Sequence, residues 1–377
     1  MIYPPLDHWL WLVPAFLIGA CIGSFLNVVI YRVPLGLSVN EPKRSFCPRC
    51  RKPIPMSLNL PLVSWLWLRG KCRECGSRIA FRYFAVELLT ALCFMAVWRV
   101  FIPVAPVAVV VLLWLVVALW ISISFIDAEH MIIPSGLTWT GTVAGLAACV
   151  IWPRLPALAG EAGGWWSGLK HGGLGWVAGF IGLGIVVELG KLAFGKKKLE
   201  FPEPVEWSLK EPEGDDDPMC FVMGGESLAW WDLFNRKSDR LLVEATDIRV
   251  DGQSVGGGLL VIREMEIELP DGKVHRLEKM KSLDGTAAKA VAPREAMGMG
   301  DVHLLGMTGA LFGWGGVVFS LFAASVLAIL AAGVARIGFG RPLPFGPFLV
   351  LGAVGWMFGG WRLLAWYLDF LSPLLQG

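Results

Sequence analysis

Two aspartates lie where long apolar runs begin or end, and their type and position make them candidates for catalysis. Asp301 closes the string Gly298-Met299-Gly300-Asp301 just ahead of an apolar stretch, and Asp127 lies at the end of an earlier one. Ionisable side chains beside hydrocarbon are rare because they are costly to place there, so they are functional candidates by default. Gly298 and Gly300 lack Cβ and allow the backbone a close approach to a bound peptide. We therefore predict that both glycines have a structural role in a catalytic loop.

The two carboxyl groups together could hydrolyse a peptide bond, which neither could do alone. The ionised group takes a proton from the attacking water, while the protonated group polarises the carbonyl. Two like charges held close cannot both ionise, so the pair should share one proton. We therefore expect Asp127 and Asp301 to converge as the catalytic pair of an aspartyl protease. Helix capping would explain a single aspartate before a helix, but not the second acid or the glycines.

Four cysteines in two C-x-x-C pairs predict a metal site. Cys47 and Cys50 are separated by twenty-one residues from Cys72 and Cys75. Each pair offers two sulfurs from one tight turn, as in tetrahedral four-thiolate zinc sites. Two disulfides are the alternative, but thiols stay reduced in the cytoplasm, where we place this loop. The zinc would be structural, because four sulfurs leave no open position for water.

The composition is that of an integral membrane protein. The chain of 377 residues is 55% hydrophobic and only 17% charged, with a mean hydropathy of +0.60 and 19 Trp. Runs of about 20 apolar residues can cross a bilayer as helices. We predict an all-α polytopic protein with eight transmembrane helices, of which the sixth is short and glycine-rich. The eight runs are 10–31, 84–102, 105–125, 132–152, 172–193, 298–314, 316–335 and 345–368.

The distribution of lysine and arginine predicts the orientation of these helices. Residues 32–83 contain eleven of them, and a second cluster comprising Lys191, Lys196, Lys197 and Lys198 follows the fifth run. By the positive-inside rule both regions are cytoplasmic, which places both catalytic candidates at the cytoplasmic face and both termini outside. No basic region precedes the first apolar run, so we expect that helix to be retained rather than cleaved as a signal peptide.

The polar insertion between the fifth and sixth runs reads as a small β-rich cytoplasmic module. Asp251-Gly252 and Asp271-Gly272 follow segments rich in apolar and β-branched residues, and Asp-Gly is a strong hairpin signal. No dinucleotide or phosphate-binding fingerprint occurs in the chain. We divide the chain into a first transmembrane helix (1–33), a zinc domain (34–83), helices two to five with Asp127 (84–193), the insertion (194–293), and the G-x-G-D motif with helices six to eight (294–377).

Six motifs, in order along the chain, resemble those of the type IV prepilin peptidases, a family of G-x-G-D aspartyl proteases. The resemblance covers about three quarters of the chain and excludes the insertion, which is larger than in typical members. His303 stands where lysine is common in the family. The motifs are Gly23 to Arg32, Pro61 to Cys75, Arg82 to Glu87, Ile126-Asp127 with Ile133-Pro134, Gly298 to Val302, and Pro344-Phe345-Gly346-Pro347.

The resemblance implies a multi-pass enzyme of the bacterial inner membrane, with its active site facing the cytoplasm. Such an enzyme removes the basic leader of type IV prepilins or of type II secretion pseudopilins, cutting after a glycine. Many members then methylate the new amino terminus with S-adenosylmethionine, whose site in this chain the sequence does not indicate. Expected partners are these substrates, membrane lipid and the pilus or secretion assembly machinery, without nucleic acid. Through its motif, Glu87 is a weaker functional candidate.

The sequence is also compatible with two other classes of protein. A presenilin-type intramembrane protease also uses a G-x-G-D acid, but places both acids well inside its spans and has no zinc loop. A transporter or assembly scaffold could use the acids to relay protons and the zinc loop to bind a partner. The scaffold alternative predicts that no cut product forms, which distinguishes it from both proteases.

Overall fold

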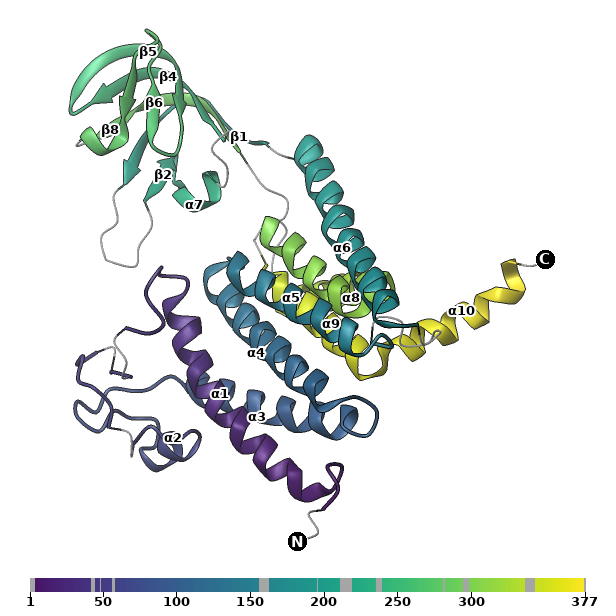
Figure 1. The fold of residues 1–377 in the computed structure, drawn as a ribbon. Helices are drawn as coiled ribbons and strands as arrows, with labels where there is room; N and C mark the ends of the chain where they lie inside the picture. The colour runs from purple at the N-terminus through teal and green to yellow at the C-terminus, as the bar shows by residue number, and fades with distance from the viewer. Residues whose placement is uncertain are drawn as a thin grey trace. The chain divides into compact units, whose positions relative to one another are not determined.

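The fold consists of a helical unit and a β-rich unit, which are described separately. The computed structural model describes residues 4–41, 45–47, 49–55, 58–155, 163–194, 196–210, 219–234, 239–280, 282–293, 298–335 and 343–375 (Figure 1). The helical unit comprises Met1–Gly184 and Met299–Gly377, and the β unit comprises Ile185–Gly298. The helical character and the β-rich insertion predicted from the sequence are both confirmed.

The helical unit is built mainly from apolar helices. A 3-10 turn at Trp9–Trp11 leads into the first helix, and a short helix lies in the four-cysteine segment. The last helix is interrupted by a π-helical turn at Trp356–Gly360. The helices are α1 (Leu12–Arg32), α2 (Val63–Trp67), α3 (Phe81–Phe101), α4 (Val107–His130), α5 (Ser135–Ile151), α6 (Trp165–Phe194), α8 (Met299–Val334), α9 (Gly346–Gly355) and α10 (Trp361–Leu375).

The described residues contain fewer long apolar helices than the eight crossings that the sequence predicts. Within the described residues, six segments are long and apolar enough to span a membrane: Trp9–Arg32, Phe81–Phe101, Val107–His130, Trp165–Lys191, Met299–Val334 and Gly346–Tyr367. The difference arises because α5 has only 17 residues and because α8 joins two predicted runs. Gly313 breaks the helical geometry of α8 with φ of 69° and ψ of −172°. If α8 crosses the membrane twice and α5 crosses it once, the number of crossings is again eight. This number stays a prediction.

Glycines let the helices of this unit approach one another at backbone distance. A Cβ added to Gly19 or Gly23 of α1 would lie 2.7 Å from the Cα atom of Ala91 or Glu87 in α3. In the same way, a Cβ added to Gly309 of α8 would lie 2.0 Å from a backbone oxygen of α6. Small residues at such crossings favour close packing in membranes, where lipid provides no hydrophobic force between helices.

The β unit is an antiparallel eight-stranded sheet with its own core. The strand order is β3-β2-β1-β8-β4-β5-β6-β7. Its core includes the fully buried Trp207, Phe221 and Ile248. The unit also holds a short helix, α7 (Trp230–Leu233), and a 3-10 turn at Leu277–Lys279. The strands are β1 (Lys196–Lys210), β2 (Cys220–Met223), β3 (Glu226–Ala229), β4 (Leu241–Val250), β5 (Gln253–Ile262), β6 (Glu266–Glu268), β7 (Val274–Arg276) and β8 (Leu283–Pro293).

The two Asp-Gly pairs that predict turns both lie in hairpin connections, whereas a third, Asp284-Gly285, lies inside β8. Val250 pairs with Gln253, so Asp251 and Gly252 form a two-residue loop between β4 and β5. Their φ angles of 51° and 80° are the positive values that such tight hairpins require. The second pair lies in the connection between β6 and β7, where Gly272 has a φ of 81°.

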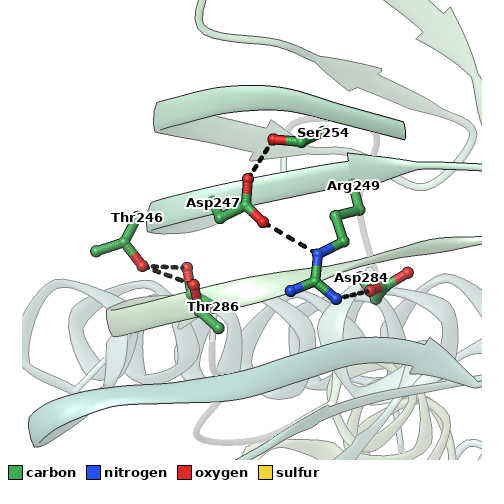
Figure 2. A network of polar contacts seen from close by, with 6 residues as sticks. All are labelled: Thr246, Asp247, Arg249, Ser254, Asp284 and Thr286. Carbon is green, nitrogen blue, oxygen red and sulfur yellow. Dashed lines mark hydrogen bonds and ion pairs between the residues drawn. The ribbon is translucent and has the colours of Figure 1, made fainter. Parts of the chain in front are cut away.

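A polar network on one face joins three neighbouring strands of the sheet (Figure 2). On β4, Asp247 accepts hydrogen bonds from Ser254 of β5 at 2.5 Å and from Arg249 at 3.0 Å. The Arg249 guanidinium also pairs with Asp284 of β8 at 3.6 Å. The Ser254 hydroxyl, together with Arg249, lowers the pKa of the Asp247 carboxyl below its ordinary value. Because the group is exposed, we interpret the network as an aid to strand register rather than as an active site.

Candidate functional site

Asp127 is buried near the carboxyl end of α4 and is held by another helix. The residue is only 5% exposed, and its Oδ2 atom accepts a hydrogen bond of 2.9 Å from the backbone N–H of Gly346. Gly346 begins α9, so the bond joins helix ends that are far apart in the chain. Just beyond Asp127, α4 ends at His130, and the next residue, Met131, has a φ of 56° and turns the chain toward α5. The acid therefore lies at a helix boundary with one oxygen fixed in orientation.

Asp301 lies in the first turn of α8, in a residue that is 8% exposed. A carboxylate at this position is stabilised by the positive end of the helix dipole. Of the two predicted supporting glycines, Gly298 is exposed and precedes the helix, whereas Gly300 is partly buried inside its first turn. Met297 and Ala296, which precede them, lie outside the described residues.

The side chain of Ile133 lies against two glycines, Gly300 and Gly346. Gly300 precedes Asp301 in the chain, and Gly346 donates a hydrogen bond to Asp127. A Cβ added to Gly300 would lie 2.6 Å from Cβ of Ile133. A Cβ added to Gly346 would lie 3.0 Å from Cδ1 of Ile133 and 2.7 Å from Oδ2 of Asp127. The α4–α5 turn, the start of α8 and the start of α9 thus meet around Ile133, with Asp127 in contact with one glycine and Asp301 next to the other. Larger residues at either glycine would push these elements apart.

His303 packs among aromatic rings. Its ring centroid lies 5.0 Å from that of Phe180 in α6 and 5.9 Å from that of Trp139 in α5. These contacts give His303 a packing role between helices. They explain how an imidazole is accommodated at this position.

An ion pair that the sequence reading missed lies at the end of α4. Glu129 pairs with Arg82 at the start of α3. The Arg82 guanidinium also lies 5.1 Å from the ring centroid of Tyr83. Because the partners belong to different helices, no spacing within the sequence indicates this pair. The contact ties the segment after the four cysteines to the helix that carries Asp127.

The four cysteines come together as a candidate metal centre. The Sγ atoms of Cys47, Cys50, Cys72 and Cys75 all lie within 4.8 Å of one another. The two pairs have the same backbone pattern: Arg51 donates its N–H to the Cys47 carbonyl at 2.8 Å, and Gly76 donates to the Cys72 carbonyl at 2.9 Å. Among the cysteines, all of which fall in the described part of the chain, each thiol is free of disulfides. The donor set and its convergence fit a tetrahedral zinc ion.

Hydrogen bonds at this cluster favour thiolates, the form that binds metal. The backbone N–H of Cys50 lowers the pKa of the Cys47 thiol to about 6, against the opposing effect of burial. The Ser77 hydroxyl, 3.1 Å from the sulfur of Cys75, lowers the pKa of that thiol as well. Against the lowering effect of the Lys52 backbone, burial and the neighbouring sulfurs of Cys47 and Cys75 raise the pKa of the Cys50 thiol to about 11. The thiolate is therefore favoured at two of the four sulfurs before any cation is bound.

Comparison with known proteins supports the family resemblance at two separate parts of the chain. A family model described as the bacterial peptidase A24 N-terminal domain matches residues 17–101, which include all four clustered cysteines. A second, described as the type IV leader peptidase family, matches residues 256–333, which include Asp301. No solved structure matches this one.

Several curated relatives carry the name prepilin leader peptidase/N-methyltransferase. The chain is 36% identical to the Klebsiella pneumoniae protein over 169 residues, covering 42% of this chain and 72% of that protein. It is 29% identical to the Aeromonas hydrophila protein over 390 residues, covering 96% and 94%. It is 47% identical to the Myxococcus xanthus protein over 135 residues, covering 35% and 38%. The chain is thus a multi-pass membrane protein that belongs to the type IV leader peptidase family.

Proposed function

We propose that this protein is a membrane-embedded aspartyl endopeptidase that removes the basic leader of type IV prepilins or type II secretion pseudopilins. It then methylates the new amino terminus with S-adenosylmethionine. The activities follow the names of its relatives, which include a type 4 prepilin-like leader peptide-processing enzyme of Escherichia coli. The observation that carries the peptidase assignment is the meeting of the Asp127 and Asp301 segments around Ile133.

In the proposed reaction, Asp127 and Asp301 share one proton. The ionised carboxylate removes a proton from the attacking water, and the protonated carboxyl donates a hydrogen bond to the scissile carbonyl. The Gly346 N–H keeps the Asp127 carboxylate in one orientation, and Gly298 and Gly300 leave room for the substrate backbone. The burial of both acids supports this assignment, since little water surrounds the reacting groups.

We place the protein in the bacterial inner membrane with both aspartates at the cytoplasmic face. The basic residues of the segment 32–83 and the lysines around the end of α6 support this orientation. On this orientation, the four-cysteine segment and the β unit are both cytoplasmic. The substrate's basic leader would also lie on this side, next to the catalytic pair.

In this proposal zinc holds the four-cysteine segment together and has no part in peptide hydrolysis. Cys47, Cys50, Cys72 and Cys75 supply four sulfurs, which leaves no position for a reacting water. A segment of this size buries too little apolar surface to order itself, so metal binding would provide its folding free energy.

The proposed function is tested by incubating the detergent-purified protein with a prepilin leader peptide and S-adenosylmethionine. We expect mass spectrometry to detect loss of the leader and gain of one methyl group on the product. A folded protein that leaves the peptide intact would support the transporter or scaffold class instead. Cleavage inside the apolar helix, rather than at its boundary, would favour a presenilin-type protease.

The contact between Gly346 and Asp127 predicts a sensitive position outside the catalytic pair. In Gly346→Ala the new Cβ would lie 2.7 Å from the Asp127 carboxylate and would displace it. We expect the cleavage rate to fall by about 10²-fold, as for other small misplacements of catalytic groups. The matched control is Gly136→Ala in α5, where an added Cβ meets nothing within 4 Å. Equal cleavage rates for the two variants would contradict a positioning role for Gly346.

A further inference from the structure

Asp127 belongs to the last turn of α4, the part of a helix that opens most easily. The helix ends at His130, and the carbonyl of Asp127 accepts the backbone N–H of Met131 at 2.9 Å. Helix ends fray because fewer backbone hydrogen bonds hold them. A catalytic group misplaced by about 1 Å can lower a reaction rate by about 10²-fold. Contacts from outside α4 are therefore needed to hold this turn in one place.

Two contacts from other helices hold the last turn of α4. The N–H of Gly346 at the start of α9 binds the Oδ2 atom of Asp127 at 2.9 Å. Two residues further on, Glu129 forms an ion pair with Arg82 of α3. Residues two apart on a helix do not face each other, so the two contacts reach the turn from different sides. The first orients the Asp127 side chain, and the second restrains the backbone that carries it.

Both charges of the ion pair lie at the helix end that disfavours them. Arg82 is the second residue of α3, and Glu129 is the last residue but one of α4. The helix dipole is positive at the first of these ends and negative at the second, so it opposes a cation on α3 and an anion on α4. The energetics of each helix by itself therefore gives no reason for these residue types. The reason lies in the contact between the two helices.

The surroundings of Arg82 make it a well-anchored partner. Its side chain is only 19% exposed, and the guanidinium lies 5.1 Å from the ring centroid of Tyr83. The carbonyl of Tyr83 accepts a hydrogen bond of 3.0 Å from the side chain of Asn27 in α1. The ring of Phe81 lies 5.6 Å from that of Trp65 in α2. The start of α3 is thus attached to both α1 and the four-cysteine segment, unlike the flexible partners of a typical surface ion pair.

We propose that Arg82 and Glu129 are positioning residues for the peptidase reaction, an inference that rests on the proposed function. Their ion pair fixes the last turn of α4 against the start of α3, and with it the backbone of Asp127. Neither side chain exchanges a proton or contacts the substrate in this role. The pair keeps the carboxyl group of Asp127 in the orientation that the shared proton with Asp301 requires. Through α2 and α3, the four-cysteine segment becomes part of the support of the catalytic helix.

The first test is steady-state cleavage of a leader peptide by the full-length protein in detergent. We expect Glu129→Gln and Arg82→Gln to lower kcat by about tenfold and to leave KM unchanged. Arg82→Lys keeps the charge without the planar guanidinium, so its kcat should lie between those of Arg82→Gln and the wild type. The double variant Arg82→Gln/Glu129→Gln should be no slower than the slower single variant, because both changes break one contact. Glu268→Gln, which breaks an ion pair with Arg263 in the β unit, is the matched control and should have the wild-type kcat.

The second test is hydrogen–deuterium exchange, which does not depend on activity. Peptides covering residues 126–134 should exchange faster in Glu129→Gln than in the wild type, because the N–H of Met131 loses protection when the turn opens. In Glu268→Gln the exchange of this segment should be unchanged. Melting temperatures establish that each variant is folded.

The outcomes separate this inference from the proposed function. A folded Glu129→Gln protein with the wild-type kcat, or with the wild-type exchange of residues 126–134, would overturn the positioning role. A change in KM alone would assign the pair to substrate binding instead. A double variant whose loss is the product of the two single losses would show that Arg82 and Glu129 act independently, which also overturns the inference. If the wild-type protein leaves the peptide intact, the proposed function fails, while exchange still tests whether the pair holds the end of α4.

Discussion

Asp127→Asn or Asp301→Asn is expected to abolish leader cleavage, lowering the rate by at least about 10³-fold to 10⁴-fold. An amide has nearly the shape of the carboxyl group but can neither take the proton of the attacking water nor share a proton with the second acid. In Asp127→Asn the side-chain carbonyl could still accept the Gly346 N–H, so we expect the fold to survive. The measurement is single-turnover cleavage of a leader peptide, followed by mass spectrometry.

Asp247→Asn is the matched control, because it replaces a hydrogen-bonded carboxylate in the β unit. It should cleave at the wild-type rate. The double variant of the catalytic pair should be no slower than either single variant, since the two groups act as one unit. A purified Asp301→Asn variant with full activity would refute the assignment.

Removal of zinc is expected to have the second-largest effect, because it should unfold the four-cysteine segment. Cys47→Ser removes a buried sulfur of the candidate metal centre, whose thiolate is favoured by the backbone of Cys50. We expect bound zinc to fall from about one ion per chain to near zero, and sites in residues 45–79 to become accessible to protease. Chelation of the wild-type protein should reproduce both changes. Metal analysis and limited proteolysis would measure them.

Cys220→Ser provides the control, since this cysteine belongs to β2 of the β unit and is not one of the four clustered cysteines. Unchanged zinc content in Cys47→Ser would argue against the four-sulfur site. The variant also tests the role of the segment in catalysis. Loss of both activities would indicate a scaffold, whereas loss of methylation alone would indicate a direct contribution to the methyl-donor site.

Local patterns in the sequence predicted the features that depend on neighbouring residues. The spacing of the cysteines places two sulfurs on each turn, and the structure brings all four together. Asp251-Gly252 and Asp271-Gly272 predicted two hairpins, because positive φ angles are required at tight turns and few other residues adopt them. Apolar runs predicted membrane helices, although a run does not reveal that Gly313 interrupts α8 or that α5 is short.

The features that only the tertiary structure decided involve residues that are distant in the chain. Nothing in the local sequence indicates that Gly346 donates to Asp127, that Arg82 pairs with Glu129, or that Ile133 packs against two glycines. The conformational preferences of the backbone extend over only a few residues, so they can be predicted from the local sequence. Packing and hydrogen bonding between helices depend on which surfaces meet, and this is determined when the whole chain folds.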